Sequence, residues 1–341
     1  MQTPSPARRH LLELGGAGAA LVAAPWLLNA RLAHAQAQSA ADLHWPTRPL
    51  RIVVGFGGGS SPDMVARTIA EPLAQALGQP VIVDNRPGAS GNIAASMVAK
   101  ANDQHTIGML INGNMTIAKV LQPSTPYDPQ KDLAPVSLIC TAPMVLTVPA
   151  AGPVKDGRSF LAAARAAGDA WSYGSPGIGT LGHLGMEVFK SQTGIGAVHV
   201  PYQGNPQVIG ALIAGQLQLA LLPPGLAEAQ VSSGKLRALG VTSATRSALV
   251  PDYPTLQEAG LPSIGLEIWT AAAAPASLPA PIRGRLATLI SQITRTPEVK
   301  QKLFAHGYGA VGSTPEELAQ QVRADTALLS RIIESQHIRL E

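Results

Sequence analysis

The segment VVGFGGGSSPD, residues 53–63, decides how the rest of the chain folds. It overlaps the end of an apolar run, Leu50–Val54, which predicts a short buried strand. An apolar-periodic run follows it and predicts a helix over residues 63–77. Ser61 suits the N-cap of that helix and Pro62 its first position. The segment therefore predicts a strand, a glycine loop and a helix start.

This arrangement is suited to holding one end of a small anion. Glycines let the backbone come close to a ligand. The first amides of a helix lack intrahelical partners and carry partial positive charge, so they attract anions. An ordinary turn between a strand and a helix has the same pattern, and this segment alone favours that plainer interpretation.

A second stretch, YGSPGIGTLGHL at residues 173–184, repeats the pattern. It follows a predicted strand over 171–173 and opens a predicted helix over 181–193, with Thr180 as the candidate N-cap. Two such loops on separate lobes that face each other offer amides and hydroxyls to both ends of a ligand. A molecule with a carboxylate at one or both ends fits, so the pair favours binding over a plain turn.

Neither loop predicts a nucleotide cofactor. Gly177, Gly179 and Gly182 form a literal GxGxxG, but the pattern needs an acidic residue about 20 positions on, and HVPYQ at 199–203 has none. The first loop lacks the Gly-Lys-Ser/Thr of a phosphate-binding Walker loop. We expect no cofactor.

A secreted hydrolase is the alternative from another class, and Ser175 with His183 is its candidate pair. Ser175 does not lie in a GxSxG elbow and no acid stands out as a third member. The eight histidines are scattered without an HxxxH or HExxH motif, and Cys140 is the single cysteine, so we expect neither a metal site nor an intrachain disulfide. The prediction is a binding protein and not an enzyme.

The charge and the N-terminus bear on location and partners. Of the formal charge of +4, the first 35 residues contribute +2, from Arg8, Arg9 and Arg31 against Glu13, so +2 remains for the rest and no nucleic-acid partner is expected. Residues 1–35 predict a signal peptide, because a basic start and an apolar stretch precede the small-x-small sequence at 33–35. We expect export to the periplasm by the Sec or the twin-arginine route.

The remaining sequence repeats the order strand, loop, helix, which predicts an α/β fold with largely parallel sheets. Val136–Val148 is predicted to be one long extended segment that crosses between two lobes. Residues 264–274 are a second extended segment, expected to cross back to the first lobe.

Several motifs together resemble the tripartite tricarboxylate transporter receptor family, the Bug-type periplasmic solute-binding proteins. The resemblance covers residues 45 to the last helix. It rests on WPTRPLRIVV at 45–54, the glycine loop ending in Asp63, DNRPGASGNI at 84–93, PYDP at 126–129, APVSL at 134–138, HVPY at 199–202, GKLRAL at 234–239 and PT at 254–255 with EAG at 258–260.

The resemblance implies two α/β lobes that close on a ligand like a flytrap, each a largely parallel sheet flanked by helices. The first lobe comprises residues 45–143 and 268–341, and the second residues 144–267. The resemblance also implies a monomer. Such a protein binds a small carboxylate through backbone amides, hydroxyls and ordered water, and delivers it to membrane transporter subunits. A ligand sensor for a signalling partner is an alternative within this class.

The chain departs from the family pattern in the first loop, where Pro62 replaces a hydroxyl residue and removes one amide, so Ser60 and Ser61 are expected to donate instead. Asp63 either contacts a ligand amine or stabilises its own helix start, and we favour the second role. The candidate ligand-binding residues are Gly57, Gly58, Gly59, Ser60, Ser61, Asp63, Asn112, Asn114, Ser175, Gly177, Gly179, Thr180, His183 and Tyr202.

Overall fold

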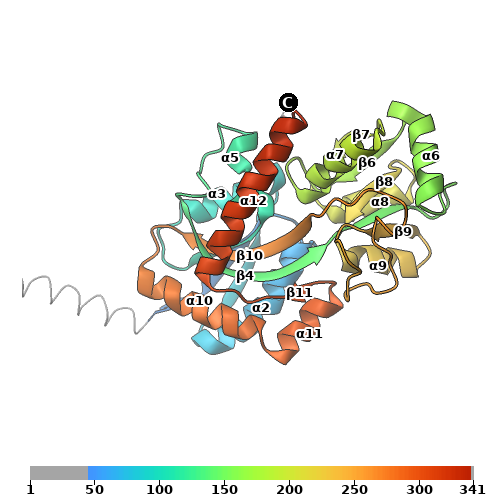
Figure 1. Ribbon diagram of the computed structural model, residues 1–341. Helices are drawn as coiled ribbons and strands as arrows, with labels where there is room; N and C mark the ends of the chain where they lie inside the picture. Colours follow the sequence, from blue (N-terminus) through green and yellow to red (C-terminus); the bar gives the residue numbers. More distant parts are fainter. Residues whose placement is uncertain (1–44, 339–341) are drawn as a thin grey trace, which may run out of the picture. The chain divides into compact units, whose positions relative to one another are not determined.

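The computed structural model describes residues 45–338, and the signal peptide predicted at 1–35 lies outside them. Within the compact unit that begins at Arg48, two β-sheets covered by helices form two lobes (Figure 1). The first sheet has the strand order β11-β4-β10-β3-β1-β2, and the second has the order β7-β6-β8-β5-β9. The predicted two-lobed α/β architecture is confirmed.

The first lobe is built on six strands: β1 (Leu50–Val54), β2 (Val81–Asn85), β3 (Thr106–Ile111), β4 (Leu133–Pro143), β10 (Glu267–Pro275) and β11 (Gly309–Ala310). Its helices are α2 (Ser61–Leu77), η2 (Ala89–Gly91), α3 (Asn92–Ala99), α4 (Asn112–Met115), α5 (Ala118–Leu121), α10 (Ala280–Thr294), α11 (Pro297–Ala305) and α12 (Pro315–Ser335).

The second lobe is built on five strands: β5 (Val145–Pro149), β6 (Ser172–Ser175), β7 (Val198–Pro201), β8 (Leu219–Leu222) and β9 (Leu236–Val241). Its helices are α6 (Gly157–Ala167), η3 (Gly168–Ala170), α7 (Leu181–Thr193), α8 (Asn205–Ile213) and α9 (Pro224–Ser232).

Each sheet has a parallel half and an antiparallel half, so the expectation of largely parallel sheets is wrong and both sheets are mixed. β1 pairs in parallel with β2 and β3, and β6 pairs in parallel with β7 and β8. These strands belong to strand–helix units, which return the chain in the same direction. β10 and β5 pair antiparallel with their neighbours, because they enter from the other lobe without such a return. The extended segment expected at Val136–Val148 is two strands, β4 and β5, which separate at Met144 and join different sheets.

The last helix packs on both lobes. Leu318 and Val322, in the first half of α12, belong to the core beside the first sheet. Leu329 and Ile333, in its second half, belong to the main core of the second lobe. Figure 1 shows α12 as the red helix that crosses beside β4 and β10. α12 therefore contributes side chains to the hydrophobic cores of both lobes.

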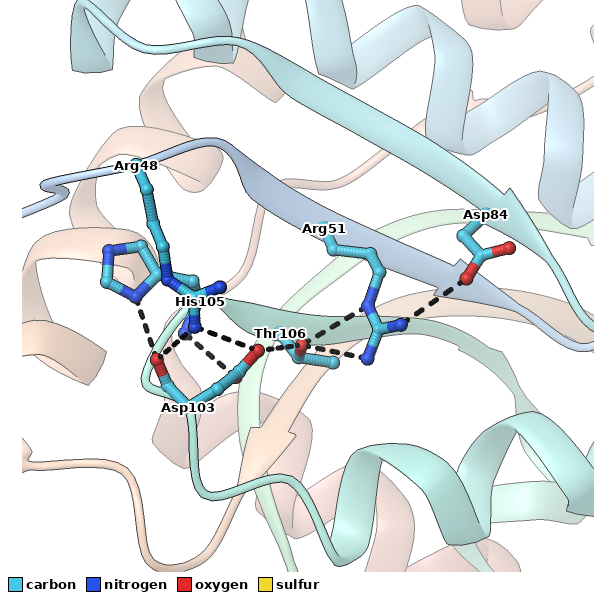
Figure 2. A network of polar contacts seen from close by, with 6 residues as sticks. All are labelled: Arg48, Arg51, Asp84, Asp103, His105 and Thr106. Carbon is cyan, nitrogen blue, oxygen red and sulfur yellow. Dashed lines mark hydrogen bonds and ion pairs between the residues drawn. The ribbon is translucent and has the colours of Figure 1, made fainter.

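A polar network holds the amino ends of β1 and β3 together, as Figure 2 shows. Arg48 pairs with Asp103 at 3.3 Å, and the Thr106 hydroxyl donates to Asp103 at 3.0 Å. Arg51 pairs with Asp84 of β2 at 3.5 Å. The glycine loop and the start of α4 follow the opposite, carboxyl ends of β1 and β3, so the Arg48–Asp103–Thr106 part of this network lies away from them and supports the sheet.

Among the helices within residues 45–338, none is both long and apolar enough to span a bilayer.

Candidate ligand-binding site

A cavity of about 60 Å³ lies between the lobes, where several helices begin. Ser60 and Ser61 bring the start of α2 to it from the first lobe. Residues 180–182 bring the start of α7, and Asn205 the start of α8, from the second lobe. Because helix starts carry partial positive charge and unpaired amides, their convergence favours an anion in this cavity.

Four buried polar side chains at this cavity have no hydrogen-bond partner in the described part of the chain. They are the hydroxyls of Ser60, Ser61 and Tyr308 and the Oδ1 atom of Asn205. A buried polar group left unpaired costs about 1–3 kcal/mol. Such a set at one cavity indicates a binding site whose ligand or water supplies the partners. Sequence reasoning missed Asn205 and Tyr308.

Tyr308 is suited to donate to an anion. Burial raises the pKa of its hydroxyl, and the Ser61 hydroxyl lies close enough to oppose this rise, although the two groups do not form a hydrogen bond of normal geometry. The phenol therefore keeps its proton at neutral pH, and that proton can go to a carboxylate oxygen.

The other lining residues are apolar or already hydrogen-bonded. The Thr180 hydroxyl donates to the Gly177 carbonyl at 2.6 Å. The Asn112 side chain donates to the Glu267 carbonyl at 3.2 Å and accepts from the Trp269 amide at 3.0 Å. The apolar lining comprises Phe56, Pro62, Ile111, Met144, Pro176, Leu181, Pro223, Ile268 and the Trp269 ring. Gly182 and Thr270 complete the lining, and the Thr270 hydroxyl is hydrogen-bonded to the Cys140 thiol.

A second cavity, of about 270 Å³, lies beyond Phe56 and Pro176, which line both cavities. Residues 88–92 of the first lobe and residues 201–203 of the second also line it. Phe56 and Pro176 therefore form a partition between the small cavity and this larger one.

The structure divides the sequence-predicted residues into three groups. Ser60, Ser61, Asn112 and Thr180 line the 60 Å³ cavity. Gly177 and Tyr202 line the 270 Å³ cavity. Gly57, Gly58, Gly59, Asp63, Asn114, Ser175, Gly179 and His183 line neither. Within the last group, Gly59, Asp63, Asn114, Ser175, Gly179 and His183 form hydrogen bonds that hold the loops in place.

The first glycine loop folds back on its own helix. The Gly59 amide donates to the Asp63 carboxylate at 2.9 Å, and Gly59 has a φ of +78°, which glycine adopts without strain. Gly58 and Gly59 are exposed. α2 begins at Ser61 with Ser60 as its N-cap, so the prediction of Ser61 as N-cap is wrong by one position.

Asp63 is held within the first lobe. Arg67 pairs with it at 3.0 Å and the Asn85 amide donates to it at 2.9 Å. Burial alone raises the pKa of the Asp63 carboxyl, but the hydrogen bonds from Arg67, Gly59 and Asn85 lower it below its ordinary value. Asn114 similarly donates to the Ser90 carbonyl at 3.0 Å, which fixes the turn beside the larger cavity.

We expect Asp63→Asn to lower the free energy of unfolding by about 1–3 kcal/mol, because the change leaves buried donors without an ionised acceptor. Ligand-induced stabilisation is expected to persist, since Asp63 does not line the cavity. Urea unfolding with and without a bound acid measures both, and the exposed Asp252→Asn serves as the control. Wild-type stability in Asp63→Asn combined with loss of ligand binding contradicts the structural role.

Two stacked histidines support the second loop. His199 Nε2 lies 2.7 Å from the Ser175 hydroxyl, which donates to the Gly177 carbonyl at 3.0 Å. His183 Nδ1 accepts from the Gly179 amide at 3.1 Å, and the His183 and His199 rings stack with centroids 4.1 Å apart. The serine partner is therefore His199 and not the expected His183.

Burial keeps both rings neutral. It lowers the pKa of His183 to about 4, with Glu187 raising it and Lys190 lowering it. It lowers the pKa of His199 to about 3, and the neighbouring His183 and Lys190 lower it further. The Tyr173 ring stacks on His199 with centroids 4.8 Å apart and donates its hydroxyl to Glu187 at 2.5 Å.

The two lobes touch where glycines leave room for a neighbouring backbone. A Cβ atom at Gly113 would lie 2.8 Å from the Gly179 carbonyl oxygen of the second lobe. A Cβ at Gly225 of α9 would lie 2.1 Å from the carbonyl oxygen of His306, which follows α11 in the first lobe. Both approaches are shorter than real Cβ atoms show, so these contacts between the lobes depend on the two glycines.

The two lobes with a partly polar cavity between them are the architecture of a solute-binding protein. Comparison with known proteins agrees. Residues 65–338 match the Tripartite tricarboxylate transporter family receptor, and the chain belongs to this family of periplasmic solute-binding receptors. A relative from Pseudomonas sp. (strain P51), the UPF0065 protein in the tcbD-tcbE intergenic region, is 34% identical over 292 residues, which are 85% of this chain and 86% of the relative.

Two solved structures similar to this chain contain organic acids. The Rhodopseudomonas palustris structure described as Rpa4515 with adipate is 32% identical, with a TM-score of 0.83 over 86% of this chain and 99% of the other. MatC (Rpa3494) from Rhodopseudomonas palustris with bound malate is 30% identical, with a TM-score of 0.80 over 85% of this chain and 100% of the other.

Proposed function

We propose that this chain is a periplasmic receptor that binds a small carboxylate in the 60 Å³ cavity and delivers it to a tripartite tricarboxylate-type transporter. The observation that carries the proposal is the set of four unpaired polar side chains around that cavity. Family membership supports the transport role. The acids in the two solved structures support the ligand class.

Closure follows from the way the ligand partners are divided between the lobes. Ser60, Ser61 and Tyr308 belong to the first lobe and Asn205 to the second. A ligand that contacts all four is bound best when the lobes meet, so it shifts the population toward the closed state. We take residues 45–143 and 268–341 as the first lobe and 144–267 as the second, in a monomer exported after removal of its signal peptide.

The contacts of Ser175 support binding rather than hydrolysis. Its hydroxyl is fully buried and donates to the Gly177 carbonyl. Because the Ser175 proton is used in the bond to Gly177, His199 Nε2 is the donor in the contact between His199 and Ser175. A protonated Nε2 cannot act as the base for the serine. Ser175 is better suited to hold the loop than to attack a substrate.

Thermal unfolding across a panel of carboxylic acids tests the proposal. An acid at 100 times its Kd stabilises by about 2.7 kcal/mol, which raises the melting temperature by about 5 °C in a chain of this size. Tyr308→Phe removes one donor and is expected to weaken that acid by about 10-fold. Tyr253→Phe is the matched control, because its hydroxyl contacts Glu228 and does not line the cavity. If no acid stabilises the wild type, the proposal is wrong.

A further inference from the structure

We infer that Ser90 of the first lobe and Gly177 of the second form a latch, a contact that holds the closed lobes together over the bound acid and sets the rate at which the acid leaves. The inference rests on the proposed function, because it concerns release from the same site. It follows from a turn that the first lobe holds in an unfavourable conformation, and from the close contact of this turn with the second glycine loop.

The turn at residues 88–91 runs through four consecutive positive φ values. Gly88 at +128° and Gly91 at +88° adopt such values without strain. Ala89 at +47° and Ser90 at +54° lie in the left-handed region, which residues with a Cβ atom rarely occupy. Such conformations persist only where the surroundings impose them, and they gather at ligand clamps and switch regions. The conformation of this turn is therefore imposed by its neighbours.

Two buried side chains of the first lobe hold the turn. The Asn114 side-chain amide donates to the Ser90 carbonyl at 3.0 Å and to Asn92 Oδ1 at 2.9 Å. The Tyr127 hydroxyl donates to the Asn114 carbonyl at 2.9 Å. Asn114 and Tyr127 are each 2% exposed, so water does not compete for these hydrogen bonds. The turn is therefore fixed to the first lobe and moves with it.

The Ser90 side chain packs directly on Gly177 of the second lobe. A Cβ atom added at Gly177 would lie 2.4 Å from Ser90 Oγ, 3.1 Å from Ser90 Cβ and 3.4 Å from Ser90 Cα. Gly177 is fixed to its own lobe, because its amide donates to the Ser175 hydroxyl at 3.2 Å. Since Ser90 and Gly177 belong to different lobes, the contact between them is lost when the lobes separate.

The latch lies beside the partition between the two cavities. Phe56 packs against the turn, because a Cβ atom at Gly91 would lie 2.9 Å from Phe56 Cε2. Pro176, the other half of the partition, precedes Gly177 in the chain. Opening of the latch therefore separates Phe56 from Pro176 and connects the 60 Å³ cavity with the 270 Å³ cavity.

A double-mutant cycle on the rate of acid release tests the latch. The probes are malate and adipate within the panel of acids, and stopped-flow fluorescence follows their release, since Trp269 lines the 60 Å³ cavity. Gly177→Ala places a Cβ atom against Ser90 and is expected to speed release about 10-fold. When Ser90→Gly has removed the opposing side chain, adding Gly177→Ala is expected to change the rate by less than about 2-fold.

The cycle separates the latch from other effects of the substitutions. The positive φ of Gly177 disfavours alanine with or without the Ser90 side chain, so this common cost cancels. Ala89→Gly is the matched control, because it relaxes the neighbouring left-handed residue, whereas the three atoms nearest to a Cβ at Gly177 all belong to Ser90. We expect Ala89→Gly to release acid like the wild type.

Two results overturn the inference in different ways. If Gly177→Ala speeds release equally with and without Ser90→Gly, Ser90 and Gly177 act independently, and the proposed function is left standing. A wild-type protein that binds no acid of the panel overturns the inference together with the proposed function.

A disulfide across the latch gives a second test that does not depend on Gly177→Ala. Ser90→Cys combined with Gly177→Cys places two Cβ atoms 3.1 Å apart, close to the roughly 3.5–4.5 Å of a disulfide. Cys140 is buried and does not compete. Oxidation with malate or adipate bound is expected to stop release of the acid, and reduction to restore it. If the folded double variant forms no disulfide, or the cross-linked protein releases acid as fast as the reduced protein, the inference is wrong.

Discussion

Gly225→Ala is expected to weaken ligand binding by about 5- to 150-fold without destabilising the second lobe. Gly225 lies within α9, where alanine favours the helix more than glycine does. Its new Cβ atom, however, would lie 2.1 Å from the His306 carbonyl oxygen of the first lobe. Relieving such overpacking costs about 1–3 kcal/mol, and the cost falls only on the closed state.

Titration of a bound acid, with thermal unfolding of the unliganded protein, measures both expectations. Gly210→Ala is the matched control, because Gly210 lies in α8 of the same lobe with no atom within 4 Å of its added Cβ. We expect Gly210→Ala to bind like the wild type. If Gly225→Ala also keeps wild-type affinity, the contact between α9 and residues 306–307 does not limit closure.

Acid is expected to destabilise the protein through the two stacked histidines. Their ordinary pKa is 6.5, whereas burial lowers the pKa of His183 to about 4 and of His199 to about 3 in the folded chain. Between pH 6.5 and about 4 the unfolded chain therefore takes up protons that the folded chain does not. The free energy of unfolding falls as pH falls through this window, by about 1.4 kcal/mol per pH unit for each ring that stays neutral.

His199→Gln separates this effect from general acid sensitivity. Glutamine does not titrate, and its amide can still donate to the Ser175 hydroxyl. We expect about half the wild-type slope of stability against pH between 5 and 6, whereas the exposed His337→Asn is expected to keep the full slope. Carboxylates with lowered pKa values, such as Asp63, lose their contribution only below the ordinary value of 3.8. An unchanged slope of stability against pH in His199→Gln would contradict the assignment of acid sensitivity to the stacked histidines.

Local sequence patterns predict the elements that local interactions stabilise. Leu50–Val54 is β1 as expected, because an apolar run before glycines ends where the chain must turn. α7 spans Leu181–Thr193 with Thr180 as N-cap, as the hydroxyl and the apolar period predict. The break at Met144 has no such signal, since β4 and β5 are both apolar and differ only in the sheet that each joins.

The site is less predictable because distant segments complete it. Ser60, Ser61 and Thr180 lie at glycine loops and could be identified from them. Tyr308 follows a helix near the end of the chain and reaches the cavity only because α11 and β11 pack on the first lobe. Asn205 precedes Pro206 at the start of α8, and a polar residue at a helix start is the one sequence signal that could have identified it. Sequence patterns also could not show that Ser175 pairs with His199.

The most direct test of the central claim is native mass spectrometry of the purified protein with the acid that raises its melting temperature most. The account predicts a complex of one acid per chain for the wild type and none for Asn205→Asp, which places a carboxylate in the lining, at the same acid concentration. Equal occupancy in the two proteins, or release of a nucleotide or metal ion in place of an acid on denaturation, would contradict a carboxylate receptor that uses this cavity.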